Sequence, residues 1–146
     1  MKKQILVIDD DASVREMLGR VLAGEGYGVH AAAHGAEALE IAGTEPVDLV
    51  LLDLNLPREN GWDVFERLTT AHPLLPVIIV TARSNQLFPA LAAGAGALLE
   101  KPPDFPTLLQ AMSRLLAEDP LARLARMSGR AAEFIYNAHH NEGDLR

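Results

Sequence analysis

Three short stretches of this sequence are unbroken runs of apolar, largely β-branched residues. They occupy positions 5–8, 49–52 and 77–80. A strand with one face in water alternates apolar and polar residues, whereas a strand buried on both faces reads as a continuous apolar run. Such runs are typical of a parallel sheet that carries helices on both faces. We therefore expect a parallel sheet at the centre of the fold, with weaker strands over positions 27–32 and 97–99.

Segments in which apolar residues recur at helical spacing separate these strands. The fifth of these helices is predicted to begin after Asp104, which is a suitable N-cap. The fourth is unusual, because a proline at position 89 is tolerated only in the first turn of a helix. This helix is therefore predicted to begin near Leu87 or Phe88 and to stop at Gly94, so that it has at most about two turns.

Five strands that alternate with five helices predict a doubly wound α/β domain, with a five-stranded parallel sheet, over residues 1–118. The residues that follow, 119–146, are too few for a second domain and are predicted to form a C-terminal helical tail. One apolar stripe of this tail could contact a second copy of the chain or a partner, and it would contain Leu121, Leu124, Phe134, Ile135 and Ala138.

The composition excludes several classes of protein. The 146 residues include no cysteine, which rules out disulfides and thiolate metal sites. The apolar runs are far shorter than the roughly 20 residues that cross a bilayer, and the first residues do not form a secretory signal. A formal net charge of −7 without a basic block argues against direct binding to nucleic acid. We expect a soluble, cytoplasmic protein that does not associate with membranes.

Polar side chains follow four of the five predicted strands. Asp9 and Asp10 come after the first strand, Asp53 after the third, Thr81 after the fourth and Lys101 after the fifth. In open α/β sheets, ligands bind at the carboxyl ends of the strands, near the point where the strand order reverses. We therefore expect these five side chains to meet at one edge of the sheet.

The chemistry of this set indicates phosphoryl transfer. Three carboxylates at close range repel one another and require a cation, and oxygen ligands with room for water suit Mg²⁺. A hydroxyl and an ammonium group beside them offer a hydrogen-bond donor and a positive charge to a tetrahedral anion. A carboxylate nucleophile, Mg²⁺, a hydroxyl and an ammonium group together are typical of a phosphoryl-transfer site.

Over residues 1–118 the sequence resembles the receiver domain of two-component response regulators. The resemblance rests on the pair Asp9-Asp10, the segment Leu-Asp-Leu-Asn-Leu-Pro that contains Asp53, and the pairs Thr81-Ala82 and Lys101-Pro102, all in the order of that family. It implies a flavodoxin-like (βα)5 fold. It also implies a phosphoprotein that acts in a phosphorelay and is not a turnover enzyme.

The resemblance assigns a role to each matching position. Asp53 would accept a phosphoryl group from a histidine kinase or a phosphotransfer protein. Asp10, Asp53 and the backbone carbonyl of Asn55 would bind Mg²⁺ directly, while Asp9 would act mostly through a bound water.

The remaining two positions would respond to the phosphoryl group. Lys101 would pair with the acceptor carboxylate and then with a phosphoryl oxygen, and Thr81 would move to hydrogen-bond the phosphoryl group. The bond between Lys101 and Pro102 matches the family's cis peptide.

Two departures from the family pattern leave a second interpretation open. Leu98 stands where the family usually has a tyrosine or phenylalanine, and the stretch from Thr81 to Lys101 is about two residues shorter than usual. Both lie on the surface that typically transmits phosphorylation. The alternative is therefore a receiver-like scaffold or dimerisation module that no longer switches.

Other interpretations of the acidic and histidine residues are weaker. An aspartyl-phosphate phosphatase would need a second acid two residues after the nucleophile, where this chain has Asn55. Asp11 is expected to cap the first helix. His30 and His34 lie four residues apart but straddle a strand end and a turn, so we do not expect them to form a metal pair.

Overall fold

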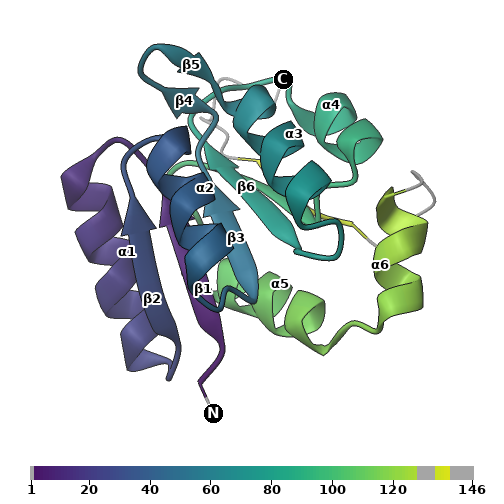
Figure 1. The fold of residues 1–146 in the computed structure, drawn as a ribbon, viewed down its shortest axis with the longest axis horizontal. Helices are drawn as coiled ribbons and strands as arrows, with labels where there is room; N and C mark the ends of the chain where they lie inside the picture. The colour runs from purple at the N-terminus through teal and green to yellow at the C-terminus, as the bar shows by residue number, and fades with distance from the viewer. Residues whose placement is uncertain (1, 128–133, 139–146) are drawn as a thin grey trace.

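A parallel sheet of six strands forms the centre of the computed structural model, which describes residues 2–127 and 134–138 (Figure 1). Its strand order is β2-β1-β3-β6-β7-β8, and every neighbouring pair is parallel. The bounds are β1 (Gln4–Ile8), β2 (Gly28–Ala32), β3 (Leu49–Leu52), β6 (Val77–Thr81), β7 (Ala97–Glu100) and β8 (Ile135–Asn137).

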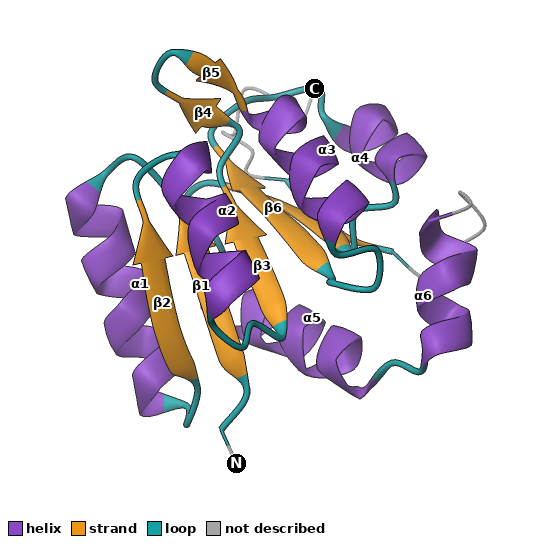
Figure 2. Ribbon diagram, viewed as in Figure 1, coloured by secondary structure: helices purple, strands orange, loops and turns teal. Residues whose placement is uncertain are grey.

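Helices cover both faces of the sheet (Figure 2). One face carries α2 (Gly35–Thr44), α3 (Gly61–Ala71) and α4 (Leu87–Ala93), and the other carries α1 (Ala12–Gly24) and α5 (Phe105–Ala117). Each face has its own apolar core, because alternate residues of the buried strands point to opposite sides. The doubly wound α/β class predicted from the apolar runs is confirmed.

The tail differs from the prediction in one respect. A helix, α6 (Pro120–Met127), occupies its first part as expected, but Ile135–Asn137 forms the sixth strand, β8, beside β7. The central sheet therefore has one strand more than the five expected, within the described residues. Phe134 and Ile135 do not share a helical stripe with Leu121 and Leu124, because a strand places these two neighbours in the separate cores on the two faces of the sheet.

The helix ends follow the chemistry expected from the sequence. The Asp11 side chain accepts hydrogen bonds from the backbone N–H groups of Ser13 and Val14, and Asp104 caps α5 in the same manner. Helix α4 begins at Leu87 and ends at Ala93, and the C-cap that follows it is Gly94, whose φ of 85° is a left-handed conformation that favours glycine.

A short hairpin lies between β3 and α3. Its strands are β4 (Asn55–Leu56) and β5 (Glu59–Asn60), and Arg58 in its turn has a φ of 63°. Gly61 follows directly and packs so closely that a Cβ atom there would lie 2.3 Å from the Cα of Leu54. The hairpin is thus held against the loop that follows β3.

Within the described ranges, 2–127 and 134–138, no helix is long and apolar enough to span a membrane.

Candidate functional site

Two buried aspartates stand at the carboxyl ends of the central strands. Asp9 follows β1 and Asp53 follows β3, and the two residues are only 2% and 4% exposed to solvent, respectively. The backbone holds them in place, because the Asp53 N–H donates to the carbonyl of Ile8 at 2.9 Å and the Asp9 N–H donates to that of Ala32 at 3.1 Å. The strand order reverses between β1 and β3, so this edge is where an α/β sheet offers a binding crevice.

Lys101 joins these two carboxylates. Its ammonium nitrogen lies 2.6 Å from Oδ2 of Asp9 and 2.9 Å from Oδ2 of Asp53. The residue directly follows β7, and its backbone N–H donates to the carbonyl of Thr81 at 2.9 Å. The peptide bond to Pro102 is cis, as the sequence resemblance implies.

Burial and the ion pairs shift two pKa values at this edge. Burial raises the pKa of the Asp9 carboxyl group, and the hydrogen bond from Lys101 offsets only part of that effect. Burial lowers the pKa of the Lys101 ammonium group, but its hydrogen bonds to Asp9 and Asp53 outweigh burial, so the net pKa is raised. The lysine is therefore held in its charged form between two acids.

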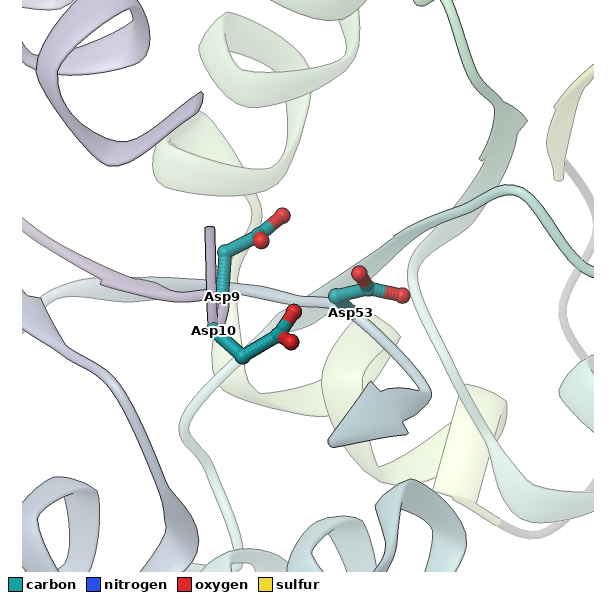
Figure 3. Close-up of side chains that lie close together, drawn as sticks. All are labelled: Asp9, Asp10 and Asp53. Carbon is teal, nitrogen blue, oxygen red and sulfur yellow. The ribbon is translucent and has the colours of Figure 1, made fainter. Parts of the chain in front are cut away.

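Asp10 adds a third carboxylate to the pair. Oxygen atoms of Asp9, Asp10 and Asp53 all lie within 4.8 Å of one another, and Figure 3 shows the three side chains side by side. Asp10 is exposed, whereas the other two are buried, so the cluster is open to solvent on one side. A set of oxygen donors with an open side fits Mg²⁺, which retains several waters when it binds to proteins.

Asn55 and Thr81 border the cluster. The backbone N–H of Asn55 donates to Oδ1 of Asp53 at 2.9 Å, which keeps the hairpin loop beside that carboxylate. Thr81, fully buried at the end of β6, accepts a hydrogen bond through Oγ1 from the backbone N–H of Arg83 at 3.2 Å. The structure thus brings the six residues singled out in the sequence to one edge of the sheet.

Two further residues near this edge have roles that the sequence did not reveal. Arg15 donates from Nη1 to the backbone carbonyl of Asp9 at 2.7 Å and so connects helix α1 to the loop that follows β1. Its position in the first turn of α1 is the only signal that could have suggested this contact. His34, considered above as half of a metal pair, instead caps α2 by accepting through Nδ1 from the N–H of Glu37 at 3.3 Å.

The fold and this site define a class of protein, and comparison with known proteins agrees. The chain belongs to the response regulator receiver domain family, which it matches over residues 5–113. Two solved structures share the fold. A CheY-like receiver domain protein from Methanospirillum hungatei has a TM-score of 0.75 and 31% identity, covering 80% of this chain and 94% of that one. The response regulator TrrA from Thermotoga maritima, in complex with Mg²⁺ and BeF, has a TM-score of 0.72 and 31% identity, covering 77% and 98%.

Relatives in sequence include the response regulator MprA. The protein of that name from Mycolicibacterium vanbaalenii is 40% identical over 118 residues, which is 80% of this chain and 51% of the relative. The one from Mycobacterium ulcerans is 39% identical over 123 residues, which is 83% of this chain and 53% of the relative. The chain thus spans about half the length of these curated relatives.

Proposed function

We propose that this chain is a phosphorylatable receiver, with Asp53 as the acceptor. The observation that carries the proposal is the position of the Asp53 carboxylate, buried against the Lys101 ammonium group and grouped with Asp9 and Asp10. A carboxylate in this setting is a nucleophile beside a fixed positive charge, and both features favour attack on a phosphorus atom. The donor would be a histidine kinase or a phosphotransfer protein.

The reaction exchanges one bond to phosphorus for another. An Asp53 oxygen forms a bond to the phosphorus of a phosphohistidine, the P–N bond breaks, and the histidine nitrogen leaves with its electron pair and takes a proton. Lys101 already lies 2.9 Å from Oδ2 of Asp53 and moves from this carboxylate to a phosphoryl oxygen. Thr81, whose Oγ1 accepts from Arg83 in this structure, turns its hydroxyl to donate to the phosphoryl group.

Mg²⁺ is the metal ion that suits this acidic cluster. Asp10, Asp53 and the backbone carbonyl of Asn55 would hold it directly, and Asp9 through a water; when bound, it supplies positive charge against the phosphoryl oxygens. The Mg²⁺ and BeF complex of the Thermotoga maritima relative supports this assignment for a chain with the same fold. Because the phosphoryl group remains on the chain itself, the protein is an acceptor with slow self-dephosphorylation and not a turnover enzyme.

The wider role follows from the acceptor chemistry. The phosphorylated chain would signal by protein contact in the cytoplasm, without direct binding to nucleic acid or membranes, and a homodimer is one form that this contact could take. Residues 1–118 would be the receiver and residues 119–146 a tail. These assignments are supported by the membership of the chain in the receiver domain family and by its fold.

A specific observation favours the second candidate function, a scaffold that does not switch. Leu98 is fully buried within β7, and α4 has only seven residues. An aliphatic side chain fixed in the core lacks the large ring that could move there. If the scaffold interpretation holds, a phosphoryl mimic at Asp53 would leave the backbone of α4 and β7 unchanged.

Intact-protein mass spectrometry tests the proposed function. The chain is incubated with Mg²⁺ and acetyl phosphate, together with the variants Asp53→Asn and Asp63→Asn. Asp63 is an exposed residue in the first turn of α3 and serves as the matched control. One phosphoryl adduct is expected on the wild type and on Asp63→Asn, and none on Asp53→Asn. Beryllofluoride binding distinguishes a short-lived adduct from an inactive site; loss of both adduct and binding contradicts the proposal.

A further inference from the structure

Strand β8 covers the edge of β7 and is only three residues long. Its register is Ala97 opposite Ile135, Leu98 opposite Tyr136 and Leu99 opposite Asn137. Without it, β7 would be the edge strand, with unpaired backbone groups between α4 and α5. A strand this short has few backbone hydrogen bonds, and such elements are the ones that open most readily in folded proteins.

Two apolar side chains anchor the strand on opposite faces of the sheet. Phe134 packs against the core that includes Ala90 and Leu98, on the side of α4, whereas Ile135 packs against the core on the side of α5. Both are only half-buried, and Tyr136 remains 42% exposed. The two anchors fix a single register of β8 against β7, but they bury little apolar surface. Limited apolar burial is what we expect of a strand that can detach.

A hydrogen bond links this strand to the residue beside the candidate site. The Tyr136 hydroxyl donates to Oε2 of Glu100 at 3.2 Å. Glu100 directly precedes Lys101 in the chain and lies opposite Thr81 in the sheet register. Glu100 therefore contacts the tail through its side chain. Its backbone adjoins Lys101 and Thr81, the two residues proposed to bind the phosphoryl group.

We propose that residues 134–138, which contain strand β8, form a detachable edge segment whose docking on β7 is coupled to the occupancy of Asp53. The coupling rests on the proposed function. A phosphoryl group on Asp53 draws Lys101 and Thr81 towards itself, which shifts the end of β7 and weakens the contact between Glu100 and Tyr136. Phosphorylation then releases the strand and uncovers the edge of β7 between α4 and α5.

Linkage makes this coupling reciprocal. If occupancy of Asp53 weakens docking of the strand, then docking of the strand weakens occupancy of Asp53 by the same factor. In the unphosphorylated protein the docked tail would cover the edge of β7 between α4 and α5. It would thereby compete with any partner that binds this edge. Substitution of Tyr136 should consequently alter the response of the tail without removing any group from the site.

Hydrogen–deuterium exchange of the full chain tests the proposal. Exchange of the amides in residues 97–100 and 135–137 is measured with Mg²⁺ alone and with Mg²⁺ plus beryllofluoride. The same measurement is made on Tyr136→Phe, which removes the hydroxyl that contacts Glu100. The matched control is Tyr27→Phe, since Tyr27 is the chain's other tyrosine and precedes β2 at the opposite edge of the sheet.

Beryllofluoride is expected to speed exchange at these amides by about fivefold or more in the wild type and in Tyr27→Phe, within the usual range of coupling between sites. Tyr136→Phe should show a markedly smaller change. Unchanged or slower exchange in the wild type overturns the coupling, and an equal response in Tyr136→Phe overturns its route through Glu100. If beryllofluoride does not bind, which a titration of the wild type against Asp53→Asn shows separately, the proposed function fails and the coupling with it.

Discussion

The ammonium nitrogen of Lys101 lies 2.9 Å from Oδ2 of Asp53, although the two residues are 48 positions apart in the sequence. The same nitrogen contacts Asp9, so one lysine compensates two buried carboxylates. Removing it leaves these negative charges together in a setting with little solvent. The ion pairs therefore affect stability as well as the proposed chemistry.

The variant Lys101→Met should be less stable than the wild type in the absence of Mg²⁺. Breaking a buried ion pair from one side costs about 3 kcal/mol, because the remaining charges stay buried without a partner. Urea unfolding with a metal chelator measures the loss, and added Mg²⁺ should restore part of it. The control Lys3→Met removes an exposed lysine and should change stability by about 0.5 kcal/mol or less. Equal stabilities of the two variants would contradict this role of Lys101.

The variant Asp10→Ala should bind Mg²⁺ more than about tenfold more weakly, since loss of about 1.4 kcal/mol of binding free energy has that effect. It should also be more stable without metal, because one of three clustered negative charges is gone. Isothermal titration and thermal unfolding provide the two readouts. Asp11→Asn removes the neighbouring charge but keeps the helix cap, so it should retain the metal affinity. A matching affinity in Asp10→Ala would refute its role as a ligand.

The variant Gly61→Ala should destabilise the chain by about 3 kcal/mol, because the new methyl group would lie 2.3 Å from the Cα of Leu54 and backbone must shift. The shift would move the hairpin that holds Asn55 beside Asp53, so phosphorylation should also fall. Gly43→Ala is the control: its methyl group meets nothing within 4 Å, and it should stabilise α2 by about 0.5–1 kcal/mol. Similar unfolding midpoints for the two variants would show that the hairpin adapts.

Deletion of residues 120–146 should leave a domain that unfolds cooperatively but with lower stability. The deletion removes the packing of Phe134 and Ile135 and exposes the β7 edge, which we expect to cost about 2 kcal/mol. Urea unfolding followed by circular dichroism measures the change. A broad transition without a defined midpoint would mean that the tail is required for the fold and that the division at residue 118 is misplaced.

Tyr136 should titrate above the ordinary tyrosine value of about 10. Burial raises the pKa of its hydroxyl group, and the Glu100 carboxylate, which accepts its hydrogen bond, raises it further. The pKa of the Tyr136 hydroxyl group is higher in the folded state than in the unfolded state. The hydrogen bond to Glu100 therefore stabilises docking of the strand fully at pH values below the unfolded-state pKa. This stabilisation is lost as the pH rises through the folded-state pKa. Ultraviolet absorbance of the Tyr27→Phe variant isolates this titration, and Glu100→Gln should lower its midpoint. An unchanged midpoint in Glu100→Gln would show that the contact does not form in solution.

The central strands and the site could be predicted because their sequence signals are local. The runs at 5–8, 49–52 and 77–80 are buried on both faces, so they carry no competing polar residue. A parallel sheet then places the residues after each strand at one edge. The start of α4 was predictable because Pro89 permits few alternatives.

The hairpin and the tail strand could not be predicted from such local signals. Strands β4 and β5 have two residues each, and their position depends on the close approach of Gly61 to Leu54. Strand β8 follows a helix and has three residues, too few for an alternating pattern. Only the β7 edge, with a separate apolar core on each side, explains why Phe134 and Ile135 point in opposite directions.

The separation of 92 positions between Asp9 and Lys101 has a consequence for the order of events during synthesis. A growing chain has its first aspartates early, but the lysine that compensates them is made only after strands β1, β2, β3, β6 and β7 have been synthesised. Until β7 joins the sheet, the acidic residues remain uncompensated and the nucleophile lacks its positive neighbour. If Asp53 is the proposed acceptor, a partly made or partly folded chain would lack the assembled site and would not compete with finished chains for the phosphoryl donor.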